Sequence, residues 1–154
     1  MKEVRSFLCA FRGIYDAVKS EAHLRFHIVA AFYVVIFAAL GEFSSHEWVL
    51  LILTISMVIF AELVNTALEK LCDLYSKEKN EKIRFIKDVS AGAVLVTAIG
   101  AALVAMVLFL IEGNLLTGFE KLLTSPHSII SLILSVPLWI IFIISPYRKH
   151  KNKD

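Results

Sequence analysis

The sequence alternates long apolar stretches with short polar ones, and this alternation predicts membrane-spanning helices. Four runs contain no Asp, Glu, Lys or Arg: residues 26–41, 48–61, 89–111 and 122–147. The last two hold the roughly 20 residues that a helix needs to cross a bilayer, and the first two reach that length when flanking polar residues are included. Hydrophobic residues make up 58% of the 154-residue chain, whereas soluble domains contain about 45–50%. We therefore predict an all-α integral membrane protein with four spanning helices.

Residues 4–19 show a different pattern, in which apolar positions recur on one face of a helix. Arg5, Arg12 and Lys19 line the flank of that face. This arrangement is typical of an amphipathic helix that lies on a membrane surface and is attracted by anionic lipid. A peripheral helix packed on other protein would show the same pattern.

The chain divides into three regions: an amphipathic interfacial helix (residues 1–20), a core of three spanning helices (21–112) and a C-terminal addition (113–154). The expected spans are residues 21–41, 46–75, 86–112 and 128–147. We expect residues 113–128 to form an outer loop with room for a short surface helix. Gly113 and Asn114 are typical of a helix C-cap, and Pro137 predicts a kink in the last span.

Lys and Arg residues are concentrated in alternate connecting segments. Five precede the first apolar run, six lie in residues 70–87 and four follow the last run, whereas the two remaining loops hold only Lys121. The positive-inside rule then places both termini and the 70–87 segment in the cytoplasm, which requires an even number of spans. Cys9 and Cys72 both face this reducing side, where free thiols are expected.

The second predicted span carries a stripe of polar residues formed by Glu62, Asn65, Glu69 and Asp73. Their spacing confines them to an arc of about 80° along about 16 Å of helix. If the crossing begins near Trp48 and takes about 20 residues, Glu62 lies inside the hydrocarbon. Ionisable groups there cost several kcal/mol and normally face a cavity, a partner or a metal. A helix that simply projects into the cytosol would explain Asp73 but fits Glu62 poorly.

Other polar residues occur at the same depth on the neighbouring spans. Glu21 and Arg25 are expected to form an i, i+4 pair at the start of the first span, with His27 just above, and Lys87 and Asp88 mark the start of the third. Carboxylates, an amide and cations would thus converge on one cytoplasmic rim. Magnesium is held by one or two carboxylates plus substrate phosphates, and phosphoryl transfer needs mainly positioning and charge neutralisation. These features favour a lipid kinase, in which a glutamate accepts the proton of a membrane alcohol.

Two other classes of protein remain open on this evidence. A proton or cation transporter subunit also carries buried carboxylates, although it would distribute them across the membrane. A non-catalytic scaffold could use them to join helices. The chain lacks the glycine-rich loops of common nucleotide-binding sites, since none of its six glycines forms one.

The motif ELVNTALEKLCDL (residues 62–74) resembles the E-x-x-N-T-A-x-E-x-x-x-D signature of the prokaryotic diacylglycerol kinase and undecaprenol kinase family. Two further segments, GIYDAVKSEAHLRFH (13–27) and IKDVSAGAV (86–94), are similar to the same family, in the same order. The resemblance spans approximately residues 4–112. It implies a homotrimeric bacterial inner-membrane kinase that uses ATP and Mg²⁺ to phosphorylate a lipid alcohol, with no nucleic-acid partner.

The resemblance also implies roles for individual residues. Glu62 would be the general base, and Glu21 and Glu69 would be the magnesium ligands. The residues implied in nucleotide binding and its organisation are Arg12, Asn65, Asp73, Lys87 and Asp88.

Within the family, the LRFH and ELVNTALE segments look more like the Gram-positive undecaprenol kinases. Undecaprenol is therefore the expected substrate, with diacylglycerol as the alternative. The chain departs from the family pattern at His23, where many relatives have Asn, and the roles of His23 and His27 stay open. It also departs in residues 115–154, whose additional span we expect to serve packing or assembly.

Overall fold

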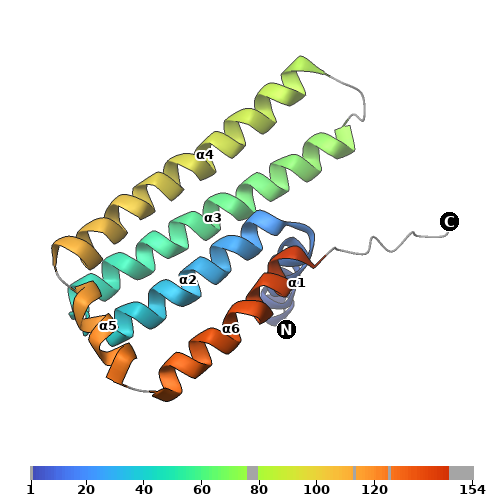
Figure 1. Cartoon of the computed structure of the whole chain (residues 1–154). Helices are drawn as coiled ribbons and strands as arrows, with labels where there is room; N and C mark the ends of the chain where they lie inside the picture. Colours follow the sequence, from blue (N-terminus) through green and yellow to red (C-terminus); the bar gives the residue numbers. More distant parts are fainter. Residues whose placement is uncertain (1, 76–79, 113, 125, 146–154) are drawn as a thin grey trace.

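The computed structural model describes residues 2–75, 80–112, 114–124 and 126–145, and within them the only regular elements are helices. Figure 1 shows their order along the chain. The elements are α1 (Lys2–Ser20), α2 (Ala22–Leu40), α3 (Ser45–Tyr75), α4 (Glu81–Met106), the π-helical turn η1 (Val107–Ile111), α5 (Asn114–Thr124) and α6 (Pro126–Ile144). The all-α prediction is confirmed.

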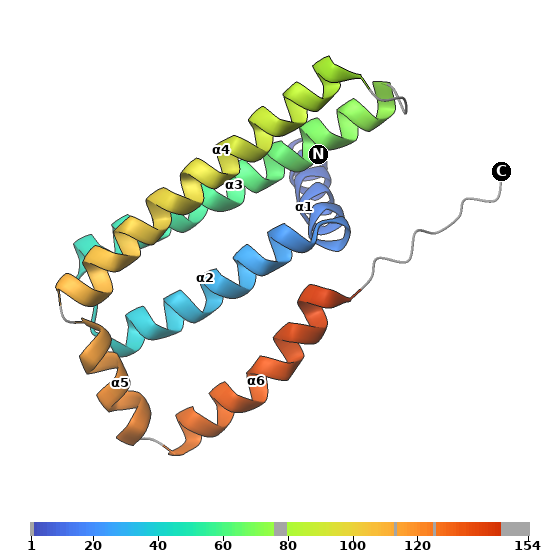
Figure 2. The ribbon, with the colours of Figure 1, turned by 45° about the horizontal axis from the view of Figure 1, so that its top comes forward.

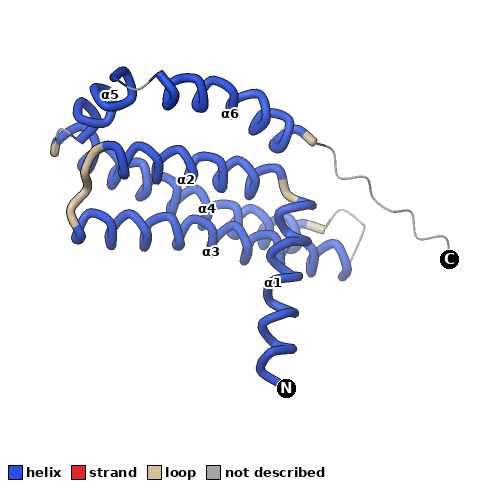
Figure 3. The backbone as a smooth tube through the Cα atoms, turned by 90° about the horizontal axis from the view of Figure 1, so that it is seen from below, coloured by secondary structure: helices blue, strands red, loops and turns tan. Residues whose placement is uncertain are grey.

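The long helices lie side by side as a bundle. α3 and α4 share the most extensive contact, α2 packs against α3, and α6 lies on the side of α2 that faces away from α3 and α4 (Figures 1 and 2). α1 crosses one end of this bundle, and α5 covers the opposite end (Figure 3). We call these the α1 end and the α5 end.

The surface of the bundle supports the prediction of a membrane protein. α2, α3 and the continuous segment α4–η1 are long and apolar enough to cross a membrane, and a fourth span is obtained when α5 and α6 are taken together as one broken span. Apolar side chains such as Leu53, Val96 and Ile141 are 59%, 70% and 66% exposed. Such wide apolar exposure is costly in water but suits contact with lipid tails.

α1 presents its apolar face to the surroundings rather than to the other helices. Phe7, Leu8 and Phe11 are exposed, whereas Ala17, in its last turn, is buried. α1 also stands across the direction of the bundle, so it would lie along the surface of a bilayer that the bundle spans (Figure 3). These observations favour the interpretation of α1 as an interfacial helix over a helix packed on this chain.

Side-chain caps determine where α3 and α4 begin. At α3, the Ser44 backbone N–H donates to Glu47 Oε2 at 2.6 Å and the Glu47 N–H donates to Ser44 Oγ at 3.4 Å, which forms a capping box. At α4, Asn80 Oδ1 accepts from the backbone N–H groups of Lys82 and Ile83. Because Asn80 caps the helix, α4 begins at Glu81, five residues before the predicted start.

The α5 end contains the main apolar cluster, formed by Ala38, Phe43, Leu51, Leu108 and Phe109. In the predicted C-cap pair, Gly113 lies outside the described residues, and Asn114 is the first residue of α5. Its side-chain amide donates to Glu47 Oε1 and to the Leu108 carbonyl at 2.9 Å. Asn114 therefore ties α5 to the start of α3 and to the end of the α4–η1 segment.

α6 packs along α2 by a few specific contacts. Tyr33 Oη lies 2.9 Å from Ser135 Oγ, and the rings of Phe32 and Trp139 are 5.0 Å apart. α6 continues through Pro137. The predicted fourth span, 128–147, is thus a helix in contact with the core up to Ile144, and its residues 146–147 lie outside the described residues.

Candidate active site

Glu62, the predicted general base, lies in the part of α3 that faces α2. Its side chain is buried, and its Oε1 is 3.2 Å from His27 Nε2 on α2. The contact is an ion pair when the imidazole is protonated. The sequence placed both residues near the α1 end but did not predict that they meet.

Asn65 connects α3 to α4. Its Oδ1 accepts a hydrogen bond of 2.6 Å from Ser90 Oγ on α4, and its Nδ2 donates to Glu69 Oε1 at 3.2 Å. Asn65 thus links two helices, and its role in organising the site stays a prediction from the family resemblance. Sequence reasoning missed Ser90, which is buried and follows Lys87 by three residues, a spacing that places both on one side of α4.

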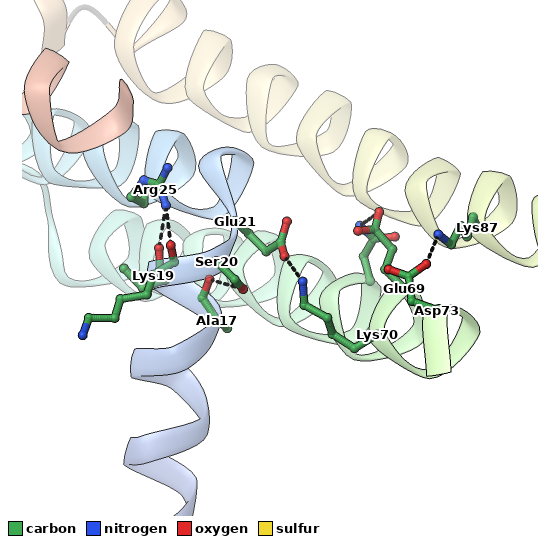
Figure 4. Close-up of polar contacts among 11 residues, drawn as sticks. Ala17, Lys19, Ser20, Glu21, Arg25, Glu69, Lys70, Asp73 and Lys87 are labelled. Atoms are coloured by element: carbon green, nitrogen blue, oxygen red, sulfur yellow. Dashed lines mark hydrogen bonds and ion pairs between the residues drawn. The ribbon is translucent and has the colours of Figure 1, made fainter. Parts of the chain in front are cut away.

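A second link between α3 and α4 lies closer to the α1 end of the bundle. Lys87 Nζ donates to Asp73 Oδ1 at 2.6 Å (Figure 4). The structure therefore brings together Asp73 and Lys87, two of the residues assigned to nucleotide binding.

Two other residues assigned to nucleotide binding do not join these contacts. Asp88 lies 3.9 Å from Arg84 and Arg12 lies 4.0 Å from Asp16, in both cases one turn away on the same exposed helix face. These short-range pairs position no other element, so the roles of Arg12 and Asp88 stay predictions from the family resemblance.

Glu21 precedes α2 and reaches across to α3, where Lys70 Nζ donates to its Oε1 at 2.9 Å (Figure 4). Burial raises the pKa of the Glu21 carboxyl, but the hydrogen bonds from Lys70 and Ser20, with the charges of Lys70 and His23, outweigh burial and hold this pKa below its ordinary value. The expected pairing of Glu21 with Arg25 is wrong. Arg25 turns instead toward the ends of α1 and α6.

The predicted magnesium ligands Glu21 and Glu69 are both close enough to Lys70 for their charges to act on it. The negative charges of Glu21, Asp73 and Glu69 all act on the Lys70 ammonium. Within the described part of a single chain, no three His, Cys, Asp or Glu side chains are close enough to hold a metal ion. The available oxygens still suit Mg²⁺, because this ion takes one or two carboxylates and completes its shell with phosphates and water.

An open cavity of about 890 Å³ separates α1 from α3 beside these residues. Gly13 and Asp16 of α1 line it on one side, and Thr66, Lys70 and Asp73 of α3 on the other. The Thr66 hydroxyl is buried and has no hydrogen-bond partner among the described residues. A volume of this size is within the range of small-molecule sites, roughly 300–1,000 Å³.

Comparison with known proteins identifies the bundle. A family model described as prokaryotic diacylglycerol kinase matches residues 8–109, which include α2, α3 and all the site residues above. The chain belongs to the prokaryotic diacylglycerol kinase family. The predictions of the family and of a lipid kinase are therefore confirmed, and neither a transporter subunit nor a non-catalytic scaffold describes it.

Two curated relatives support the same family. The chain is 36% identical over 106 residues to the undecaprenol kinase of Bacillus subtilis (strain 168). The aligned region covers 69% of this kinase and 86% of that protein. The chain is 35% identical over 106 residues to a diacylglycerol kinase of Synechocystis sp., and that aligned region covers 68% of this kinase and 61% of that protein. No solved structure matches this kinase significantly. The family match ends at residue 109, so α5 and α6 lie outside it.

Proposed function

We propose that this kinase transfers the γ-phosphoryl group of ATP to undecaprenol and produces undecaprenyl phosphate. The observation that carries the proposal is the buried carboxylate of Glu62, beside a cluster of carboxylates and lysines at the α1 end. The higher similarity and coverage of the Bacillus undecaprenol kinase support undecaprenol. The Synechocystis relative makes diacylglycerol the alternative substrate.

In the proposed reaction, Glu62 accepts the proton of the lipid hydroxyl. The hydroxyl oxygen forms a bond to the γ-phosphorus, the bond between that phosphorus and the β,γ-bridging oxygen breaks, and ADP leaves. The apolar surface of the bundle lets the lipid approach laterally from the membrane. Removing water from around Glu62 strengthens its electrostatic interactions with the reacting groups.

We propose that Glu21 and Glu69 hold Mg²⁺ through their carboxylate oxygens, where it would neutralise charge on the transferring phosphates. Lys87 would contact the nucleotide phosphates, with Asp73 and Asn65 maintaining the connection between α3 and α4 that positions this lysine. The cavity between α1 and α3 provides space for the nucleotide beside Lys70 and Asp73.

Phosphorylation by the purified full-length protein in mixed micelles tests the proposal. With ATP and Mg²⁺, we expect a higher kcat/KM for undecaprenol than for diacylglycerol, and no product when the metal is chelated. Loss of a general base typically reduces rates by about 10²–10⁴-fold, so Glu62→Gln should reduce kcat by that factor.

Glu112→Gln is the matched control, because Glu112 is an exposed glutamate at the α5 end. It should keep the wild-type rate. Normal turnover by a folded Glu62→Gln variant would remove the general-base role. If the kinase phosphorylates diacylglycerol in preference, diacylglycerol is the substrate and the proposal of undecaprenol is wrong.

We also propose that the kinase is a homotrimer in the bacterial inner membrane, with both termini in the cytoplasm. The family resemblance supports the trimer, and the distribution of Lys and Arg supports the orientation. Native mass spectrometry of the detergent-solubilised protein should give three times the mass of one chain.

A further inference from the structure

The contact between His27 and Glu62 joins two helices at the predicted catalytic base. The two side chains come from α2 and α3, and are 21% and 4% exposed. His27 Nε2 and Glu62 Oε1 are 3.2 Å apart. An ionisable pair with so little exposure is costly to form, so the pairing of the proposed base with a histidine requires an explanation.

His27 carries the basic group that lies closest to Glu62. The charges that act on this carboxylate come from His27 and His23 at the start of α2 and from the acidic groups Glu69 and Glu21. In the described part of the chain, His27 carries the one basic nitrogen within 4.0 Å of a Glu62 oxygen. The two glutamates repel Glu62, and His23 is exposed, so His27 provides the direct contact.

The imidazole has a ring contact on one side and an apolar slot on another. The ring of Phe26 meets it edge to face, with the ring centroids 5.6 Å apart. On the side away from the polar residues, His27 borders an apolar slot of about 100 Å³ between α2, α3 and α4, whose walls include Val58 and Ala105. The slot offers Glu62 no charged alternative partner. Rotation of the imidazole into this slot would remove the one basic nitrogen that contacts Glu62 in the described part of the chain.

We infer that His27 is the positioning residue for Glu62 and holds the carboxylate in the orientation from which it takes the lipid hydroxyl proton. This inference rests on the proposed function of Glu62 as the general base. A free glutamate side chain has several rotamers, and selecting one of them increases the fraction of encounters in which the base is aligned. Helix α2 thus contributes to the alignment of a catalytic group carried by α3.

Steady-state kinetics of His27 variants test this inference in the same micelle assay. Misplacement of a reacting group by about 1 Å can cost about 10²-fold in rate. We expect His27→Ala to lower kcat by about 10–100-fold, with the KM values for ATP and lipid changed less than about threefold. His27→Gln should recover a substantial part of kcat, because its amide N–H can donate to the carboxylate.

His46→Ala is the control, since His46 is an exposed histidine in the first turn of α3 at the α5 end. It should leave kcat within about twofold of wild type. Thermal unfolding in detergent checks whether each variant is folded. If His27→Ala is not folded, the kinetics of His27→Gln and the spectroscopic test below decide whether His27 positions Glu62. A folded His27→Ala with wild-type kcat would overturn the inference, as would an increase in KM alone.

A spectroscopic measurement separates this inference from the proposed function. The imidazole ¹⁵N resonances of His27 should shift when Glu62 is changed to Gln, and should stay unchanged in Glu112→Gln. If the His27 resonances do not shift in Glu62→Gln, the positioning role is wrong, even when the wild-type protein phosphorylates a lipid. If the shift occurs but the wild-type protein phosphorylates neither lipid, the pairing stands and the proposed function fails.

Discussion

Arg25 is a buried cation whose hydrogen-bond partners are backbone carbonyls. Its Nη1 donates to the carbonyls of Val18 and Lys19 at 2.9 and 3.1 Å, in the last turn of α1 (Figure 4). Its Nε and Nη2 donate to the Ile143 carbonyl at 3.2 and 3.0 Å, and Nη2 also donates to that of Ser145 at 3.3 Å. The last carbonyls of a helix lack partners within the helix and carry partial negative charge. One guanidinium thus caps both α1 and α6.

We expect Arg25→Ala to destabilise the kinase by about 1–3 kcal/mol, the cost of removing charge-assisted bonds and leaving polar groups unpaired. Arg25→Lys should recover only part of this loss, because an ammonium lacks the planar fork of donors. Thermal unfolding in detergent measures the effect. Arg5→Ala is the control, since Arg5 is exposed on α1. Equal unfolding temperatures for Arg25→Ala and Arg5→Ala would contradict the capping role.

At the scale of helices, α6 contributes to packing but carries none of the predicted site residues. It lies beyond the matched family region and contacts α2 through Tyr33, Phe32 and Arg25, on the side away from α3. The contacts of Glu62, Asn65 and Lys87 all form among α2, α3 and α4. Stability and catalysis should therefore respond differently to changes in α6.

Trp139→Ala tests this separation, because the Trp139 ring packs at a tilt against Phe32 and also meets Phe142 edge to face within α6. Loss of an aromatic pair costs about 0.5–1.5 kcal/mol beyond the lost burial, so the unfolding temperature should fall by a few degrees. The rate of lipid phosphorylation should stay within about twofold of wild type. Leu138→Ala is the control, since Leu138 is 68% exposed. A large loss of kcat in folded Trp139→Ala would show that α6 takes part in catalysis.

At the scale of the whole molecule, the two ends of the bundle differ in chemistry. The α1 end holds the pairs Glu21–Lys70 and Asp73–Lys87 beside the buried Glu62, whereas the α5 end holds the pair Glu42–Lys121 beside the apolar cluster around Phe43 and Phe109. ATP is cytosolic, so the proposed function requires the α1 end to face the cytoplasm. The distribution of Lys and Arg along the chain predicts the same orientation.

Thiol labelling in oriented membranes checks this orientation. Cys9 is exposed on α1 and Cys72 is buried, so a membrane-impermeant maleimide should react with Cys9 from the cytoplasmic side only. In a Cys9→Ser background, His46→Cys should react only from the opposite side, because His46 is exposed near the α5 end. Labelling of both positions from one side would contradict a bundle that spans the membrane.

Much of the fold could be predicted because it depends on local pattern. The apolar runs predicted the spans, and the periodicity of residues 4–19 predicted α1. The start of α4 was misplaced because Asn80 acts as a helix cap within a polar segment that reads as a connector. Of the site, the polar stripe on α3 was predicted, but Ser90 was missed, since one serine in an apolar helix carries no distinctive signal.

The sequence by itself determined that the chain is helical, enters a membrane and belongs to a family of lipid kinases, because hydrophobic transfer and motif spacing are properties of contiguous residues. Only the tertiary structure decided which polar groups meet. Glu62 pairs with His27, Glu21 pairs with Lys70 rather than Arg25, and Arg25 bonds to carbonyls of α1 and α6. These partners are set by how the helices pack, and packing depends on side-chain shape and burial summed over helices far apart in the chain.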